Sequence, residues 1–213
     1  MKTNLVHLVL LSAGFTVSLI LVRIFYSDSI TYCFLIWNIF LGAIPLFVSS
    51  RLNNAIKKDL QWILLTAWLI FFPNALYIIT DLIHLKERYP VPIWFDIILI
   101  SSAVFNGLFF AYISLCQIEL FLRSKFDNKK TGLILFLFLF LGSFGVYIGR
   151  FLRWNSWDIV VNPSGLAFEV IQHIINPLRH PRTWSMTITL TFFFSIFYFI
   201  IKKIPGLINK PGN

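Results

Sequence analysis

Four polar side chains follow helical spacing in one strongly apolar segment, residues 71–85. Steps of three, four and three residues link Asn74, Tyr77, Asp81 and His84, so a helix would present all four on one face. Polar groups are costly in hydrocarbon unless they have partners. The spacing favours a ligand or catalytic site, with Asp81 and His84 as candidate proton-transfer groups and Asn74 and Tyr77 as candidate ligand-binding residues. The alternative is structural: Asn74 compensates for Pro73, and the others anchor at the interface or meet water.

A second polar group lies at the end of a later apolar run, in residues 147–158. Two arginines three residues apart on a helix would share a face, where they could hold a carboxylate, a phosphate or a lipid headgroup. The alternative is a structural one, in which the tryptophans form an aromatic belt and the arginines pair with Asp81 and Asp158. The candidate ligand-binding residues here are Arg150, Arg153, Asn155 and Asp158.

The remaining polar residues indicate no familiar chemistry. His173 and His180 are seven residues apart across a proline, which is no recognised metal-ligand spacing, so we predict no metal site and name no cofactor. The sequence has no Gly-rich phosphate loop, HExxH motif or nucleophile elbow, so an enzymatic activity stays undecided. Asp96 is expected to cap a helix. Asn38, Ser102 and Asn106 are expected to form bonds between helices.

The amino-acid composition indicates whether these polar side chains are surrounded mainly by water or by lipid. The chain has 213 residues, of which 58% are hydrophobic and only 13% are charged. The apolar residues come in runs of about 20, the length that a helix needs to cross a bilayer. The net charge of +9 comes from Lys and Arg in short segments between these runs, which argues against a nucleic-acid partner. The bilayer is the expected partner, and the oligomeric state is left open.

The sequence predicts an all-α membrane protein, a bundle of about six transmembrane helices in a single domain over residues 1–203. A short cytoplasmic tail is expected at 204–213. Asn162 followed by Pro163 is a typical helix start, so a short interfacial helix is expected to run from there to Asn176, between the fifth and sixth spans. The predicted spans are 5–25, 31–49, 60–80, 97–121, 133–148 and 184–201.

Lys and Arg are unevenly divided between the two sides of this predicted bundle. One side holds eleven of them, including those near both termini, and the other holds seven. Because cytoplasmic loops retain cations, both termini are expected in the cytoplasm of a plasma-membrane protein. The loops after the third and fifth spans then open together on the outer side, where the two polar groups could form a joint site.

The two polar groups also carry a resemblance to a known family. The sequence is similar to bacterial integral membrane proteins grouped as domain of unknown function 1361. The resemblance covers nearly the whole chain, from about the second helix to the sixth, and it implies a multi-pass membrane protein without supplying an activity. It rests on FPNALYIITDLIHL (72–85), PIWFD (92–96) and GRFLRWNSWD (149–158).

Three functions remain open from the sequence. The first is a membrane-embedded enzyme or binding protein that acts on a small anionic or lipid-like ligand at the outer face. The second is a transporter or channel subunit, which the nearly uncharged midplane of the predicted bundle argues against. The third is a non-catalytic scaffold or assembly partner, in which the same polar residues lock the fold.

Overall fold

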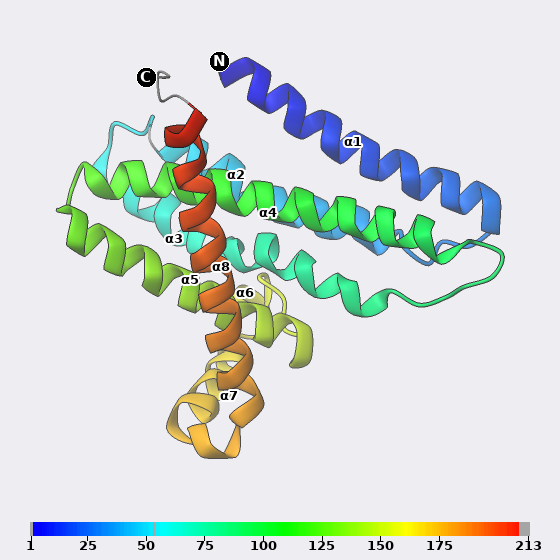
Figure 1. The fold of residues 1–213 in the computed structure, drawn as a ribbon. Helices are drawn as coiled ribbons and strands as arrows, with labels where there is room; N and C mark the ends of the chain where they lie inside the picture. The colour runs from blue at the N-terminus through cyan, green and yellow to red at the C-terminus, as the bar shows by residue number, and fades with distance from the viewer. Residues whose placement is uncertain (1, 53, 209–213) are drawn as a thin grey trace. The chain divides into compact units, whose positions relative to one another are not determined.

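The computed structural model describes residues 2–52 and 54–208, which fold as helices joined by turns and loops (Figure 1). Contacts divide the chain into two compact units, unit 1 (Met1–Phe121) and unit 2 (Leu122–Asn213). Unit 1 comprises α1 (Lys2–Ser27), α2 (Phe34–Leu52), α3 (Lys58–Tyr77), the 3-10 helix η1 (Ile78–His84) and α4 (Ile93–Arg123), whose last two residues fall in unit 2. Unit 2 continues with α5 (Asn128–Phe151), α6 (Asp158–Val161), α7 (Pro163–Ile175), the 3-10 helix η2 (Pro177–Arg179) and α8 (Pro181–Ile208).

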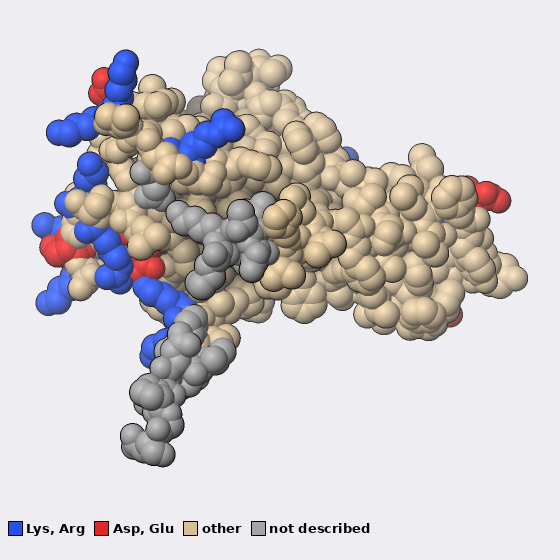
Figure 2. Space-filling view, turned by 90° about the horizontal axis from the view of Figure 1, so that it is seen from above, with Lys and Arg blue, Asp and Glu red and all other residues tan. Residues whose placement is uncertain are grey.

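Six helical segments among the described residues are long and apolar enough to cross a membrane, and they confirm the predicted number and order of spans. Large apolar side chains are exposed along them, Leu11 and Ile63 among them, as a lipid environment allows. Figure 2 shows a broad part of the visible surface without any Lys, Arg, Asp or Glu. The molecule is therefore a multi-pass membrane protein.

The observed helix ends differ from the predicted ones by several residues, as at α5, which begins at Asn128 rather than at residue 133. The second helix begins at Phe34 rather than at residue 31, because residues 31–33 form a turn. The last helix continues to Ile208, past the predicted end of the sixth span at residue 201, and the cytoplasmic tail predicted from residue 204 stays a prediction. Residues 209–213 of that predicted tail lie outside the described residues. The single domain predicted over 1–203 stays a prediction, since each unit is described by itself.

Unit 1 is built around α3, which packs against α2. Trp68 and Phe72 of α3 are fully buried and stack with their ring centroids 4.4 Å apart. A Cβ added at Gly107 of α4 would lie 2.7 Å from the backbone oxygen of Ala75, so only glycine allows α4 this close to the end of α3. This close approach positions η1, which carries two of the candidate site residues.

Unit 2 is held together by α5 and α8, which pack against each other. The ring of Trp184 in α8 stacks on Phe144 of α5 with centroids 5.6 Å apart. The helix start predicted at Asn162 is confirmed: its side chain accepts a hydrogen bond from the backbone N of Gly165 at 3.1 Å, and α7 begins at Pro163. The short helix between the fifth and sixth spans is thus present.

Candidate functional site

A buried ion pair joins the first and fourth helices of unit 1. Arg23 of α1 donates from Nε to Oδ1 of Asp96 at 2.7 Å and from Nη2 to Oδ2 at 3.2 Å. The exposed fractions of the two side chains are 3% and 0%. Asp96 lies in the first turn of α4, where a negative charge is favourable, and its carboxylate is in addition bound by the planar fork of a guanidinium.

Tyr32 lies beside this ion pair and links it to the loop after η1. Its hydroxyl donates a hydrogen bond to the backbone oxygen of His84 at 3.1 Å. The guanidinium carbons of Arg23 and Arg88 lie 4.5 and 5.9 Å from the centre of its ring. Burial raises the pKa of Tyr32 above its ordinary value, and the negative charge of Asp96 raises it further. Tyr32 therefore stays neutral and can donate this bond at physiological pH.

Asp81 is a buried carboxylate within the same unit. It is 1% exposed, and its Oδ2 accepts a hydrogen bond from the side-chain amide of Asn38 at 2.8 Å, which connects η1 to α2. His84 is half-buried, and its ring meets Phe34 edge to face with centroids 5.0 Å apart. Because residues three apart eclipse in a 3-10 helix, Asp81 and His84 project from the same side of η1. The spacing is suited to proton transfer at a shared ligand.

The other two members of the predicted stripe belong to α3. The side-chain amide of Asn74 donates to the backbone oxygen of Phe71 at 3.0 Å, as the structural alternative expects beside Pro73. Tyr77 is half-buried at the last turn of α3. The single α-helical face predicted for all four residues is thus interrupted, because α3 changes to a 3-10 helix at Ile78.

Asn38, Ser102 and Asn106, which were predicted to form hydrogen bonds between helices, form such bonds in the structure. The amide of Asn106 in α4 donates to the hydroxyl of Thr16 in α1 at 2.9 Å, and Thr16 donates to Ser102 at 3.0 Å. Figure 1 shows α1 running alongside α4, as these bonds require. Asn38 forms its own bond between helices with Asp81. These contacts fix helix packing within unit 1 and leave Asp81 and His84 as its candidate reactive groups.

The second predicted group lies in unit 2, where α5 ends. α5 stops at Phe151 and Arg153 adopts a left-handed backbone conformation with φ of 61°. The two arginines therefore do not share a helical face, contrary to the prediction, because the helix ends between them. Arg150 is half-buried, and Arg153 is exposed without a hydrogen bond or ion pair to the described residues.

The residues after Arg153 form a compact turn. Oδ2 of Asp158 accepts a hydrogen bond from the backbone N of Asn155 at 2.6 Å, so Asp158 closes the turn at the start of α6. The ring of Trp154 packs over Gly165, where an added Cβ would lie 2.9 Å from it. The Asn155 side chain is exposed. This turn positions Arg153 beside the start of α7.

The third polar group contains two imidazole rings in close contact. The rings of His173 and His180 have centroids 3.9 Å apart, and Nδ1 of His173 lies 2.8 Å from the backbone oxygen of Glu169. Within the described residues there is no cluster of three or more His, Cys, Asp or Glu that could hold a metal ion. Among the described residues, Cys33 and Cys116 form no disulfide, and both are half-buried.

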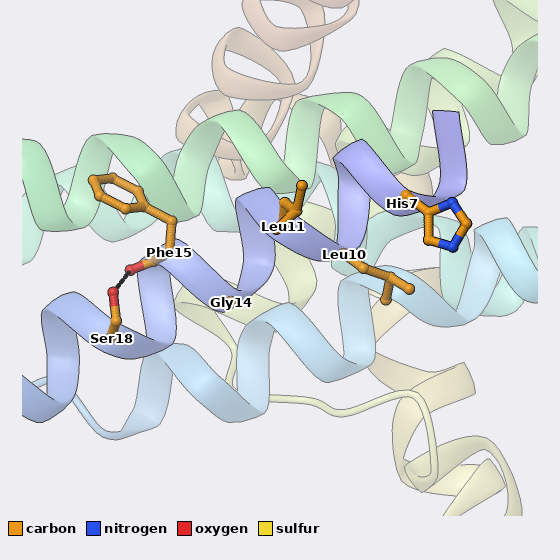
Figure 3. A pocket seen from close by; sticks show the side chains of 6 residues that line it. All are labelled: His7, Leu10, Leu11, Gly14, Phe15 and Ser18. Atoms are coloured by element: carbon orange, nitrogen blue, oxygen red, sulfur yellow. Dashed lines mark hydrogen bonds between the residues drawn. The ribbon is translucent and has the colours of Figure 1, made fainter. Parts of the chain in front are cut away.

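A pocket lies along α1, and most of the side chains that line it are apolar. Its only polar side chains are His7 and Ser18, and the Ser18 hydroxyl donates to the backbone oxygen of Phe15 at 2.7 Å (Figure 3). The open space follows from Gly14, which has no side chain to fill it. The pocket is lined by His7, Leu10, Leu11, Gly14, Phe15 and Ser18.

Sequence reasoning missed Arg23, Tyr32 and the pairing of Asp96. Arg23 was counted only as a loop cation, although it lies inside the first predicted span. Two opposite charges within or at the edge of different spans are a usable signal, because intramembrane charges usually pair. Glu119 of α4 was missed in the same way and is 6% exposed. The two predicted polar groups fall in different units, so their joint site stays a prediction.

The fold and these buried polar contacts define the class of protein, a multi-pass membrane protein. Residues 37–197 match the family model described as "Protein of unknown function (DUF1361)", and the chain belongs to this family. The matched range contains every predicted site residue. No curated protein and no solved structure matches the chain.

Proposed function

We propose that this chain is a plasma-membrane protein whose polar residues at the outer face bind, or act on, a small anionic or lipid-like ligand. Asp81 and His84 are its proton-transfer groups. Asn74 and Tyr77 are ligand-binding residues of the same group in unit 1. Arg150, Arg153, Asn155 and Asp158 form a ligand-binding group in unit 2, where the two arginines bind the anionic part of a ligand.

The observation that carries this proposal is one buried guanidinium nitrogen in unit 1. The Nε of Arg88 is buried and has no hydrogen-bond partner among the described residues. The Asp96 carboxylate is already held by two bonds from Arg23. A buried donor without an acceptor costs about 1–3 kcal/mol, so an anion that accepts from the Arg88 guanidinium would be stabilised there. In unit 2, Arg153 is an exposed cation that a ligand can reach.

The proposed orientation places both termini in the cytoplasm. Of the cations on the sparser side, Arg23 is buried against Asp96 rather than in a loop. Removing it from the outer count strengthens the charge bias from which the orientation follows. Arg88, His84 and Arg153 then all belong to connections on the outer side.

A thermal-shift experiment tests the proposed ligand class. The purified protein is heated with inorganic phosphate or with short-chain phosphatidylglycerol, and unfolding is followed for wild type, Arg88→Gln, Asp81→Asn and Arg153→Ala. We expect the ligand to raise Tm for wild type and not for the three variants. Arg51→Ala is the matched control, an exposed arginine on the predicted cytoplasmic side.

The two probes separate a lipid from a free anion. A shift with phosphatidylglycerol alone identifies a lipid headgroup, whereas a shift with both identifies phosphate as the recognised group. Equal shifts in wild type and all three site variants, or no shift with either probe, would overturn the proposal.

A structural lock is the second candidate function. It is favoured by the Arg23–Asp96 pair, which joins two helices and leaves neither charge available to a ligand. If the lock is the whole role of the polar residues, exchanging the charges of Arg23 and Asp96 together should restore the fold that either single change loses. A swap that fails to restore it argues against this candidate.

A further inference from the structure

The helix α7 is amphipathic in the opposite sense to a helix on a water-soluble protein. Its polar stripe, Glu169, Gln172, His173 and Asn176, lies on the buried or half-buried side. Helices that face water turn their apolar stripe inward and their polar residues outward. The outer surroundings of α7 are therefore apolar.

The inward direction of the polar stripe is fixed by contacts within unit 2. His173 is 3% exposed, and its ring lies 6.0 Å from that of Tyr147 in α5. Its backbone oxygen accepts a hydrogen bond from Nε1 of Trp184 in α8 at 3.2 Å. The His173 ring also contacts the ring of His180, with the two planes tilted by 34°. α7 is thus seated on α5 and α8 through its polar side.

The outward side of α7 is a continuous apolar surface. Phe168 is 62% exposed and Ile175 is 68% exposed, with Ile171 and Ile174 between them. Val160 of α6 and Leu178 of η2 extend this exposure before and after the helix. We name this surface the α7 face: Val160, Val161, Phe168, Ile171, Ile174, Ile175 and Leu178.

We propose that the α7 face is inserted into the phospholipid interface and is a membrane-contact surface separate from the six spans. A 13-residue helix is about 20 Å long, too short to cross about 30 Å of hydrocarbon, so it lies along the membrane rather than through it. Its segment is joined at both ends to membrane-spanning helices, α5 and α8, which places the α7 face next to an established lipid surface.

Charge supports lipid rather than a second protein as the occupant. Arg153 precedes α6, and Arg179 and Arg182 follow α7, all three exposed. Cations beside an inserted apolar face are attracted to the phosphates of lipid headgroups. The α7 face would then hold Arg153 at headgroup depth. Arg153 also belongs to the proposed ligand site, but the inference rests on the α7 face, whose residues do not, so failure of either proposal leaves the other standing.

Depth-dependent quenching tests the inserted face. Single cysteines at Phe168→Cys and Ile175→Cys are introduced after Cys33→Ser and Cys116→Ser, labelled with an environment-sensitive fluorophore, and reconstituted into vesicles of phosphatidylcholine with a minority of phosphatidylglycerol. Phe192→Cys, on the exposed side of α8, is the lipid control, and Glu87→Cys, in the exposed loop after η1, is the water control.

We expect nitroxide-labelled lipid to reduce emission at both α7 positions by about twofold or more, as at Phe192→Cys, and iodide to have little effect, as expected for apolar residues buried at the acyl boundary. Iodide quenching equal to that at Glu87→Cys would overturn the proposal. Protection from both quenchers, together with disulfide-linked dimers through Ile175→Cys, would overturn it in favour of a second copy of the chain.

Discussion

Arg23 and Asp96, which are 73 positions apart in the chain, form two hydrogen bonds inside unit 1 and bring α1 against α4. Removing one member of a buried ion pair leaves an uncompensated charge and costs about 3–5 kcal/mol. We therefore expect Arg23→Met and Asp96→Leu to lower the free energy of unfolding in detergent by about that amount.

The double variant Arg23→Met with Asp96→Leu is the informative control. It removes both charges, so we expect it to recover most of the stability that either single variant loses. A double variant that is as unstable as the two losses added together would contradict this account of the pair.

The bond from Asn38 to Asp81 is expected to stabilise the connection between α2 and η1. Asn38→Leu removes a donor from a buried carboxylate and should lower the free energy of unfolding by about 1–3 kcal/mol. Asn54→Ala, which alters an exposed amide, should change it by less than about 0.5 kcal/mol. Equal effects in denaturant titrations would rule out a special role for the Asn38 bond.

Arg153 occupies a backbone conformation that suits glycine better than arginine. Arg153→Gly should be more stable than Arg153→Ala by about 1 kcal/mol, because Ala retains the steric cost of positive φ. Both variants remove the guanidinium, so under the proposed function both lose the anionic ligand. A glycine variant that unfolds more readily than the alanine variant would show that this conformation is not maintained.

Gly107 allows α4 to approach the end of α3. Gly107→Ala puts a methyl group 2.7 Å from the backbone oxygen of Ala75 and should cost about 1–3 kcal/mol in unfolding free energy. Gly132→Ala is the matched control, since nothing lies within 4 Å of the added carbon in α5. The better helix propensity of alanine predicts a gain there of up to about 1 kcal/mol. Similar losses at both positions would refute the close packing.

Tyr32 is expected to make stability depend on alkaline pH. Its pKa in the folded protein is raised above the ordinary value of 10.0 by burial and then by Asp96. The folded state therefore binds the phenolic proton more tightly, and this contribution is fully present below the ordinary pKa. It is lost as pH rises through the raised pKa. Wild type should lose stability in that range more steeply than Tyr32→Phe, and parallel pH profiles would contradict the shift.

The transmembrane architecture could be predicted from the sequence because length and apolarity determine it. The start of α7 was also predictable, since Asn162 and Pro163 act through local backbone geometry that needs no tertiary contact. Helix ends were less predictable. α3 changes to a 3-10 helix at Ile78, where the chain packs closely against Gly42 and Gly107, and no local signal marks that change.

The candidate site was predicted in part. Asp81 could be singled out by its spacing and is buried in the structure, but its partner Asn38 lies 43 positions away and could not be named from one sequence. Arg23 and Asp96 were each assigned a local role, as a loop cation and a helix cap. Their pairing depends on how α1 and α4 pack, which spacing within either helix does not encode.

Mass spectrometry of the gently purified protein tests the central claim, that the outer polar residues bind an anionic or lipid-like ligand. The protein is released from detergent in the spectrometer, and any retained species is identified by mass in wild type, Asp81→Asn, Arg153→Ala and the control Arg51→Ala. The account predicts an anionic or lipid-like species on wild type and Arg51→Ala that is lost from the two site variants. A wild-type protein that retains no such species, or site variants that retain it fully, would contradict the account.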